Sequence, residues 1–261
     1  MIITITNNRG GTGKSTTAQT LATGLALKHK KVLLIDLDPQ CNTSSTFKVK
    51  DSQYTILDVL TNKCSISDAI NHKEYIDIIA SDINLISYEK FINIDTDYEY
   101  TKHKQLSLYI EPIKNYYDFI VIDTAPNLSQ LTTNAIYSSD YVLIPLLADI
   151  YSIEGLAIIK KQIDKIRQDT DNKNVKISGL LLTHYKAQTI VNQSLRDALY
   201  NVATQLNTKV YKNVIRDSVI FSDSQANNDV CLLRYPTHNA SADYIGFINE
   251  FLKDMEDSKN G

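Results

Sequence analysis

The chain has 261 residues, of which 43% are hydrophobic and 22% charged, and its formal net charge is −3. This composition is typical of a folded globular protein and excludes a mainly disordered chain. No apolar run is long enough to span a membrane, no basic N-terminal segment precedes an apolar core, and the three cysteines form no Cys-x-x-Cys pair. We therefore expect a cytoplasmic protein folded as a single domain over residues 1–261, without disulfides or a zinc site.

The first predicted elements surround a glycine-rich turn. Residues 2–6 are apolar and β-branched, which predicts a buried strand, and apolar residues at helical spacing over 14–26 predict a helix. A glycine-rich turn between a strand and a helix is the setting of a phosphate-binding loop, because free backbone N–H groups at the helix start attract anions. Gly10, Gly11 and Gly13 let the backbone approach the phosphate oxygens.

Side chains of the same loop supply the specific contacts to a polyphosphate. Lys14 can reach the β- and γ-phosphates, the Ser15 hydroxyl can ligate Mg²⁺, and Thr16 can bond the α-phosphate. Asn8 stands where the general P-loop pattern has glycine, so the match is incomplete, and a glycine-rich turn without a ligand is the alternative. The predicted nucleotide-binding residues of this loop are Gly10, Gly11, Thr12, Gly13, Lys14, Ser15 and Thr16.

Predicted strands and helices alternate along the rest of the chain. We expect strands at 32–36, 75–80, 119–123, 141–147, 175–183 and 208–214, and helices at 55–60, 65–71, 152–169, 188–206 and 240–256. Residues 42–46 and 93–105 are expected to be loops, the second leading into a helix, and residues 256–261 a frayed tail. This order predicts an α/β fold with a doubly wound, mostly parallel sheet and helices on both faces.

Three acids stand at the ends of predicted strands. Asp36 and Asp38 lie at the end of the strand 32–36, and Asp123 closes the strand 119–123. Ligands of such sheets bind beyond the carboxyl ends of the strands, so these acids should converge with the glycine-rich loop. A buried carboxylate is costly unless it faces a cation. We predict that Asp123 serves Mg²⁺ through a water and that Asp36 lies near the same shell; capping of a loop or helix is the alternative role.

The charge is unevenly distributed along the chain. Residues 151–216 carry 11 Lys and Arg against 5 Asp and Glu, whereas residues 217–261 carry 3 against 8. A basic segment of this kind can bind a polyanion such as DNA, or it can be an ordinary solvated surface. Charge alone leaves both interpretations open.

Three segments together resemble the ParA/MinD superfamily of deviant Walker A P-loop ATPases. Residues 9–16 are similar to its Walker A motif, residues 32–42 to the segment that follows it, and residues 117–126 to its Walker B strand. The resemblance extends to about residue 250 and, without a preceding helix-turn-helix segment, points to the short ParA/Soj-type partition ATPases. Departures from the family pattern are Arg9 for lysine, Cys41 for glycine and Asn127 for serine.

The resemblance implies roles for residues outside the phosphate-binding loop. Asp38 would orient the attacking water. Arg9, in the place of the family's lysine, would cross a dimer interface and touch the nucleotide phosphates of the partner subunit; the alternative is a loop contact within its own subunit. Thr183, Arg216 and Asp217 would pack against the adenine.

The implied activity is hydrolysis of ATP with Mg²⁺, slow in the absence of a partner. By resemblance, ATP forms a homodimer that binds non-specific DNA and segregates a plasmid, chromosome or phage genome, and a ParB-like centromere-binding protein stimulates hydrolysis. The protein would then be associated with the nucleoid. ATP is favoured over GTP because no Asn/Thr-Lys-x-Asp sequence follows a predicted strand.

Other ATPases of this superfamily give three alternative functions. A MinD-like membrane-surface ATPase ends in a basic amphipathic helix. Here the polar side of the last predicted helix carries Asp243, Glu250, Asp254 and Glu256, which anionic lipid would repel, so we expect no membrane partner. An iron-protein-like reductase needs cysteines that bridge a cluster, and a bacterial tyrosine kinase needs a terminal tyrosine cluster; the sequence has neither pattern.

Overall fold

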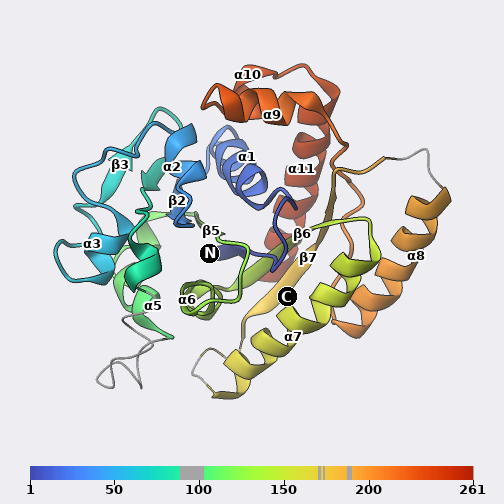
Figure 1. The fold of residues 1–261 in the computed structure, drawn as a ribbon, viewed down its shortest axis with the longest axis horizontal. Coiled ribbons are helices and arrows are strands. Elements are labelled where there is room, and N and C mark those ends of the chain that lie inside the picture. The colour runs from blue at the N-terminus through green and yellow to red at the C-terminus, as the bar shows by residue number, and fades with distance from the viewer. Residues whose placement is uncertain (89–102, 170–171, 173, 187–189, 261) are drawn as a thin grey trace.

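The computed structural model describes residues 1–88, 103–169, 172, 174–186 and 190–260 (Figure 1). Within this part of the chain, one sheet has the strand order β3-β4-β2-β5-β1-β6-β7. Every neighbouring pair is parallel except β3 and β4, which are antiparallel. The strands are β1 (Ile2–Ile5), β2 (Val32–Leu37), β3 (Ile70–His72), β4 (Asp77–Ile79), β5 (Phe119–Thr124), β6 (Tyr141–Leu147) and β7 (Lys176–Thr183).

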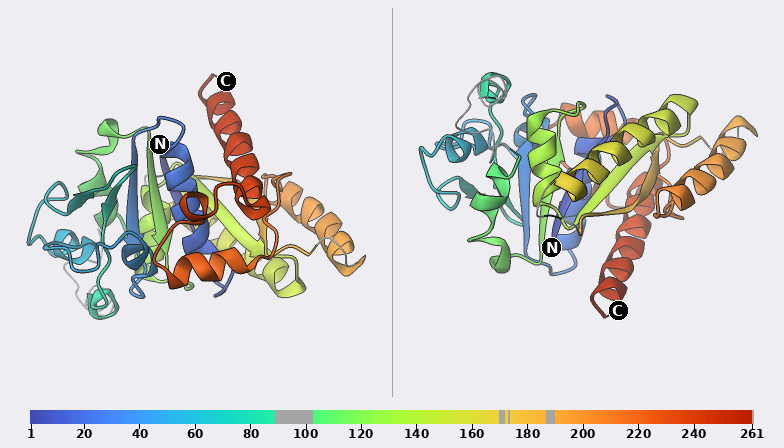
Figure 2. Two further views of the ribbon diagram at one scale, coloured as in Figure 1. Left: turned by 90° about the horizontal axis from the view of Figure 1, so that it is seen from above. Right: turned by 90° about the horizontal axis from the view of Figure 1, so that it is seen from below.

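Helices cover both faces of the sheet, so the predicted doubly wound α/β fold is confirmed (Figure 2). One face carries α1 (Lys14–Ala26), α9 (Val219–Ala226), α10 (Cys231–Arg234) and α11 (Asn239–Asn260). The other carries α3 (Ile56–Leu60), α5 (Gln105–Ile110), α6 (Gln130–Ser138), α7 (Ile150–Asp169) and α8 (Ile190–Gln205). Two short helices, α2 (Asn42–Thr46) and η2 (Lys114–Tyr116), complete the described elements.

Strand β2 shows why both faces need a cover. Every residue of β2 is buried, and successive side chains of a strand point to opposite faces. Leu34 packs in the core below α1 and α11, whereas Leu33 and Ile35 pack in the core below α3, α5 and α6. A strand that is buried on both faces needs a helical layer on each of them. This places the end of β2, with its acids, in the interior of the molecule.

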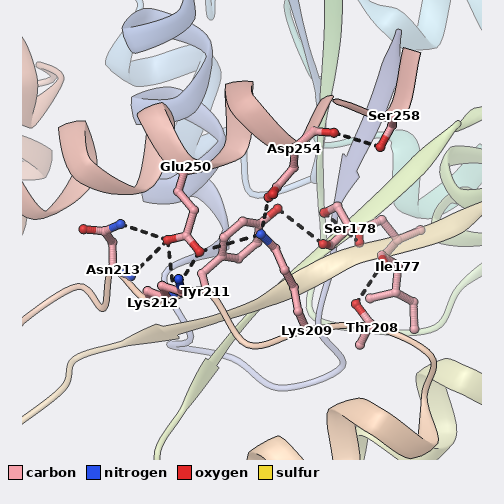
Figure 3. A network of polar contacts seen from close by, with 11 residues as sticks. Ile177, Ser178, Thr208, Lys209, Tyr211, Lys212, Asn213, Glu250, Asp254 and Ser258 are labelled. Atoms are coloured by element: carbon pink, nitrogen blue, oxygen red, sulfur yellow. Dashed lines mark hydrogen bonds and ion pairs between the residues drawn. The ribbon is translucent and has the colours of Figure 1, made fainter. Parts of the chain in front are cut away.

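The segment predicted as a strand at 208–214 is not a strand. Its backbone forms a single bridge to β7, at Val210. The amides of Lys212 and Asn213 donate instead to the carboxylate of Glu250 on α11, at 3.1 and 3.2 Å (Figure 3). The Glu250 side chain thus takes hydrogen bonds that a strand ladder would have used. It anchors residues 208–214 to the C-terminal helix α11.

Gly179 in β7 makes room for a large buried ring. Tyr211 is fully buried and packs edge to face on Phe247, with 4.8 Å between ring centroids. A Cβ on Gly179 would lie 2.4 Å from Cε2 of Tyr211. We expect Gly179→Ala to lower the free energy of unfolding by about 1–3 kcal/mol, because the rigid ring must move.

Urea unfolding would measure this loss in the Gly179→Ala variant. Gly10→Ala is the matched control, because a Cβ on Gly10 has nothing within 4 Å. Equal urea midpoints for the two variants would show that the pocket around Tyr211 relaxes at no cost.

Two other local predictions are wrong. Residues 42–46 form α2 rather than a loop, because the Asp36 carboxylate accepts hydrogen bonds from both the amide and the hydroxyl of Ser44 in its first turn. Residues 65–71 do not form a helix. The Asp68 carboxylate closes a turn on the amide and hydroxyl of Ser65, and the chain then enters β3.

Other local predictions have mixed outcomes. The helices at 14–26, 55–60, 152–169 and 240–256 are confirmed, and the helix at 188–206 is confirmed over 190–205, since residues 188 and 189 lie outside the described part of the chain. The helix after the loop 93–105 is also confirmed, and most of that loop lies outside the described residues. Helices α6, α9 and α10 were not predicted. Helix α11 continues through residue 260, so the expected tail is helical, while its fraying stays a prediction.

Candidate functional site

The glycine-rich loop lies between β1 and α1, with two residues in the left-handed region. Gly11 has φ 72° and Gly13 has φ 73°, and Gly13 is the residue that precedes the first turn of α1. Such angles favour glycine because a Cβ would strain the backbone. Lys14 is buried, and its Nζ donates to the Arg9 carbonyl at 2.8 Å. Burial lowers the pKa of Lys14, and the charges of Asp123 and Asp38 oppose that effect.

Neighbouring strands hold the loop in place. The Asn7 side chain donates from Nδ2 to the Pro145 carbonyl at 2.7 Å and accepts from the Arg9 amide at 3.0 Å. The Thr183 hydroxyl donates to the Thr12 carbonyl at 3.0 Å. The loop is therefore fixed to the ends of β6 and β7. The anchoring role of Asn7 was not predicted, although this residue stands directly before the glycine-rich motif in the sequence.

Two cavities meet at this loop and share Gly11, Gly13, Thr16, Phe221 and Gln225. The first measures about 270 Å³ and the second about 590 Å³. Among the predicted residues, the first is lined by Gly10, Gly11, Gly13, Lys14, Ser15, Thr16 and Asp38, and the second by Gly11, Gly13, Thr16, Thr183 and Asp217. The loop thus separates a polar space suited to phosphates from a wider space suited to a base.

Asp36 and Asp123 are register partners on the neighbouring strands β2 and β5, and both are fully buried. Asp36 has protein donors on both oxygens. Its Oδ2 accepts from the Ser44 amide at 2.7 Å and the Ser44 hydroxyl at 2.6 Å, and its Oδ1 accepts from the Asp38 amide at 3.2 Å. Burial raises the pKa of Asp36 despite these bonds. The contacts give Asp36 the task of holding α2; its place near Mg²⁺ stays a prediction.

Asp123 has one occupied and one unoccupied oxygen. Its Oδ2 accepts from the Thr43 hydroxyl at 2.7 Å, whereas Oδ1 is buried and has no hydrogen-bond partner among the described residues. Burial raises the pKa of Asp123, and the neighbouring Asp36 raises it further, while the hydrogen bond from Thr43 and the nearby Ser15 hydroxyl act in the opposite direction. An orphaned carboxylate oxygen beside the Ser15 hydroxyl is an oxygen donor set that fits Mg²⁺.

Asp38 lies at the wall of the first cavity. Its side chain accepts from the Gln40 amide at 2.9 Å, and its carbonyl accepts from the Ser81 hydroxyl at 2.7 Å. These bonds fix the loop after β2 so that the carboxylate borders the space next to the glycine-rich loop. The position is compatible with an acid that orients a water.

Of the three residues predicted to pack against the adenine, two line the second cavity. Thr183 and Asp217 line the second cavity, but Arg216 does not. The Arg216 guanidinium forms two hydrogen bonds with Asp243 of α11, at 2.6 and 2.8 Å. Arg216 therefore supports the wall from behind. Asp217 is paired with His184 at 3.0 Å, and the hydrogen bond from His184 holds the pKa of Asp217 below its usual range.

Helix α9 contributes residues that the sequence analysis missed. Phe221 and Gln225 line both cavities, so they stand where the two spaces join. Phe221 packs edge to face on Tyr244, whose hydroxyl is 3.0 Å from that of Thr17 in α1. The available signal was Ser218, which caps α9 by accepting from the Ile220 amide.

Known proteins resemble this chain over most of its length. A family model described as AAA domain matches residues 1–177. The sporulation initiation inhibitor protein Soj of Bacillus subtilis is 32% identical over 253 residues, which cover 95% of this chain and 97% of that protein. The chain belongs to the ParA/Soj family of P-loop ATPases.

Solved structures agree with this family assignment. A putative plasmid partition protein from Borrelia burgdorferi, bound to AMPPNP, is 28% identical with a TM-score of 0.79, and the match covers 97% of this chain and 98% of that chain. Cobyrinic acid a,c-diamide synthase of Mycobacterium smegmatis, with bound ADP and magnesium, shares the fold at 21% identity and a TM-score of 0.82, covering 98% and 95% of the two chains. In the described part of this ParA/Soj-family chain, no helix could cross a membrane.

Two departures from the ParA/Soj pattern can now be located. Cys41, in the place of glycine, has φ 55° and precedes α2. That angle explains the family's glycine, and the cysteine adopts it at a cost of roughly 1–2 kcal/mol. Asn127 is exposed, and its carbonyl accepts from the Thr132 hydroxyl of α6 at 2.8 Å. Nothing in the structure explains the choice of asparagine at this position.

The third departure, Arg9, makes a contact within its own subunit. Its Nη1 is 2.5 and 2.6 Å from the two oxygens of Asp149, and its guanidinium carbon lies 5.9 Å from the centre of the Tyr151 ring. Asp149 also caps α7 by accepting from the Ser152 amide at 2.9 Å. The Arg9 side chain is 39% exposed. It is thus held at the surface, beside the first cavity rather than in it.

Proposed function

We propose that this chain is an ATPase that dimerises with ATP and segregates DNA, of a plasmid, chromosome or phage. The observation that carries the proposal is the pair of joined cavities, with a Walker-type loop between them and an orphaned Asp123 oxygen beside Ser15. The similarity to Soj and to an AMPPNP-bound plasmid partition protein supports the same function. A cytoplasmic location at the nucleoid is part of this proposal.

Each side chain of the site would have a separate task. Loop amides and Lys14 would bind the phosphates. Ser15 would ligate Mg²⁺ and Asp123 would contact it through a water, and the ion would neutralise phosphate charge. Asp38 orients the attacking water, and Thr183 and Asp217 border the base. The site positions charge and awaits a partner, so we expect slow turnover until a ParB-like partner binds.

Lys14 provides the test of the nucleotide site. We expect the wild-type chain to bind ATP more tightly than GTP in the presence of Mg²⁺. Lys14→Ala should weaken ATP binding by ~10-fold or more, because a charge-assisted hydrogen bond to phosphate contributes about 1.5–3 kcal/mol. Isothermal titration of both proteins measures the effect, with Lys28→Ala, an exposed lysine at the far end of α1, as the control. Equal ATP affinity in wild-type and Lys14→Ala proteins would refute the site.

The basic segment is less available to DNA than its charge indicates. Seven cations of this segment are candidate contacts to DNA phosphates: Lys160, Lys161, Lys165, Lys186, Lys209, Lys212 and Arg216. Four of them are paired with acids. The pairs are Lys160 with Asp164, Lys186 with Asp217, Lys209 with Glu250 and Asp254, and Arg216 with Asp243. Lys161, Lys165 and Lys212 have no ion pair among the described residues. Gln188, which matches a DNA-contacting arginine of some relatives, lies outside them.

DNA binding is therefore expected to be weak in the monomer and stronger in an ATP dimer, where two patches act together. A gel shift on random duplex DNA at low salt, with ATP and the non-hydrolysing Asp38→Ala variant, measures it. The affinity should fall steeply as salt rises, because each phosphate contact releases a counterion. Lys161→Ala combined with Lys165→Ala should weaken binding uniformly across sequences. No shift at low salt would exclude DNA as the surface on which this ATPase acts.

A MinD-like membrane ATPase is the alternative, and the structure gives it no support. Tyr244, Phe247, Ile248 and Phe251 of α11 are buried in the core, so the apolar face of this helix is covered. The acids on its other side pair with Arg216 and with Lys209.

A further inference from the structure

Two adjacent hydroxyls of α2 each bind one of the paired acids. Thr43 and Ser44 are both fully buried in this short helix. The Ser44 hydroxyl donates to Asp36 at 2.6 Å, and the Thr43 hydroxyl donates to Asp123 at 2.7 Å. The two acids are register partners on β2 and β5, so neighbouring hydroxyls of one helix bind neighbouring carboxylates of the sheet. The arrangement leaves Asp36 saturated and Asp123 with one free oxygen.

Gln19 of α1 holds the Thr43 hydroxyl in place. Its Nε2 donates to Thr43 Oγ1 at 3.0 Å, and both side chains are buried. A hydroxyl has a single proton and can accept at its lone pairs. An ionised carboxylate can only accept, so Thr43 is the donor in its bond with Asp123, and the bond from Gln19 occupies a lone pair of the same hydroxyl and holds it in this orientation. The chain from Gln19 through Thr43 therefore occupies Oδ2 of Asp123 and no other acceptor.

We propose that Thr43, oriented by Gln19, is a positioning residue for Asp123. By fixing Oδ2, it sets the rotamer of the carboxylate and leaves Oδ1 as the oxygen available to the Mg²⁺ of a bound nucleotide. A single available oxygen suits Mg²⁺, which binds proteins through few carboxylate oxygens and keeps several waters. Partners of metal-binding side chains commonly tune metal affinity in this way. The inference rests on the Mg²⁺–ATP site proposed above.

A purely structural role makes a different prediction. If Thr43 only satisfies a buried hydrogen bond, its loss would lower the free energy of unfolding and leave the Mg²⁺ requirement of nucleotide binding unchanged. If it positions Asp123, the Mg²⁺ requirement itself must change. The Mg²⁺ concentration at half-maximal nucleotide binding therefore separates the two roles.

The experiment titrates Mg²⁺ into the full chain with a fixed amount of fluorescent N-methylanthraniloyl-ATP and records the midpoint. We expect Thr43→Val to raise the midpoint ~10-fold or more, as for other partners of metal ligands. Thr43→Ser restores the hydroxyl and should return the midpoint to within about 2-fold of wild type. Thr23→Val is the matched control, because Thr23 is equally buried in α1 and its hydroxyl has no partner among the described residues; its midpoint should equal that of wild type.

A second pair of variants keeps the test decisive if Thr43→Val does not fold, as judged by circular dichroism. Gln19→Leu should raise the midpoint because the Thr43 hydroxyl is no longer held in its orientation toward Asp123. In an Asp123→Asn background, Gln19→Leu should have no additional effect, since the carboxylate through which it acts is gone.

An unchanged midpoint in both Thr43→Val and Gln19→Leu would overturn the positioning role. If the wild-type protein bound the nucleotide without any dependence on Mg²⁺, the proposed function would fail instead, and the two failures are thereby distinguished.

Discussion

Asp38→Ala is expected to reduce ATP hydrolysis by ~100-fold or more while Mg²⁺–ATP stays bound. The carboxylate lines the phosphate-side cavity, and the Gln40 amide holds it in place at 2.9 Å. A positioned group that orients or deprotonates the attacking water contributes typically 10²–10⁴-fold to the rate. Its removal leaves the loop, Lys14 and Asp123 intact, so the affinity for Mg²⁺–ATP should stay close to that of the wild-type protein.

Two measurements on one preparation check this result. Phosphate release, with and without a partner protein, gives the rate, and fluorescent ATP binding gives the affinity. Asp51→Ala is the control, since Asp51 is an exposed acid a short way further along the chain and lines neither cavity. If Asp38→Ala hydrolyses ATP at the wild-type rate, another group orients the water.

The parts of the site that were predictable are those fixed by local sequence. Strand, glycine turn and helix determine the phosphate-binding loop, and the φ angles of Gly11 and Gly13 follow from that turn. Asp123 was predictable as the end of an apolar strand. That Asp36 binds α2 while Asp123 keeps a free oxygen depends on Thr43 and Ser44, whose helix the polar sequence 42–46 did not reveal. Hydrogen bonds between residues far apart in the sequence therefore determine which of the two acids keeps a free oxygen.

Contacts over long sequence distances also explain two features near the C-terminal end that were not predicted. Residues 208–214 have a strand-like sequence, but Glu250 takes two of their amides. Arg216 is basic and adjacent to the base cavity, but Asp243 turns its guanidinium away. Both acids lie on α11, more than twenty residues along the chain. Local patterns give no information about which acid reaches which donor.

Arg9→Ala is expected to abolish ATP-dependent dimerisation while the monomer still binds ATP. In the ParA/Soj family this position is proposed to neutralise charge between two facing nucleotides, which requires a permanent cation on a long side chain. Arg9→Lys should keep dimerisation, with turnover changed because the planar guanidinium that binds two oxygens is lost. Light scattering on an Asp38→Ala background, with and without Mg²⁺–ATP, measures the dimer separately from hydrolysis. If Arg9→Ala dimerised at the same protein concentration as the Asp38→Ala parent, the cross-subunit role would be contradicted.

The ion pair between Arg9 and Asp149 provides an independent test, in which a substitution should strengthen dimerisation rather than abolish it. Arg9 must leave Asp149 before it can reach a partner subunit, so the pair should oppose dimerisation. Both side chains are partly exposed, and such pairs contribute at most about 1 kcal/mol, which corresponds to a shift of up to ~5-fold per subunit. Asp149→Asn removes the charge but keeps a side chain that caps α7 well, as the hydrogen bond from Ser152 requires. We therefore expect Asp149→Asn to dimerise with ATP at lower protein concentration than the parent, and Asp149→Asn with Arg9→Ala to remain monomeric. Weaker dimerisation of Asp149→Asn would mean instead that the Arg9–Asp149 pair is part of the dimer-forming state.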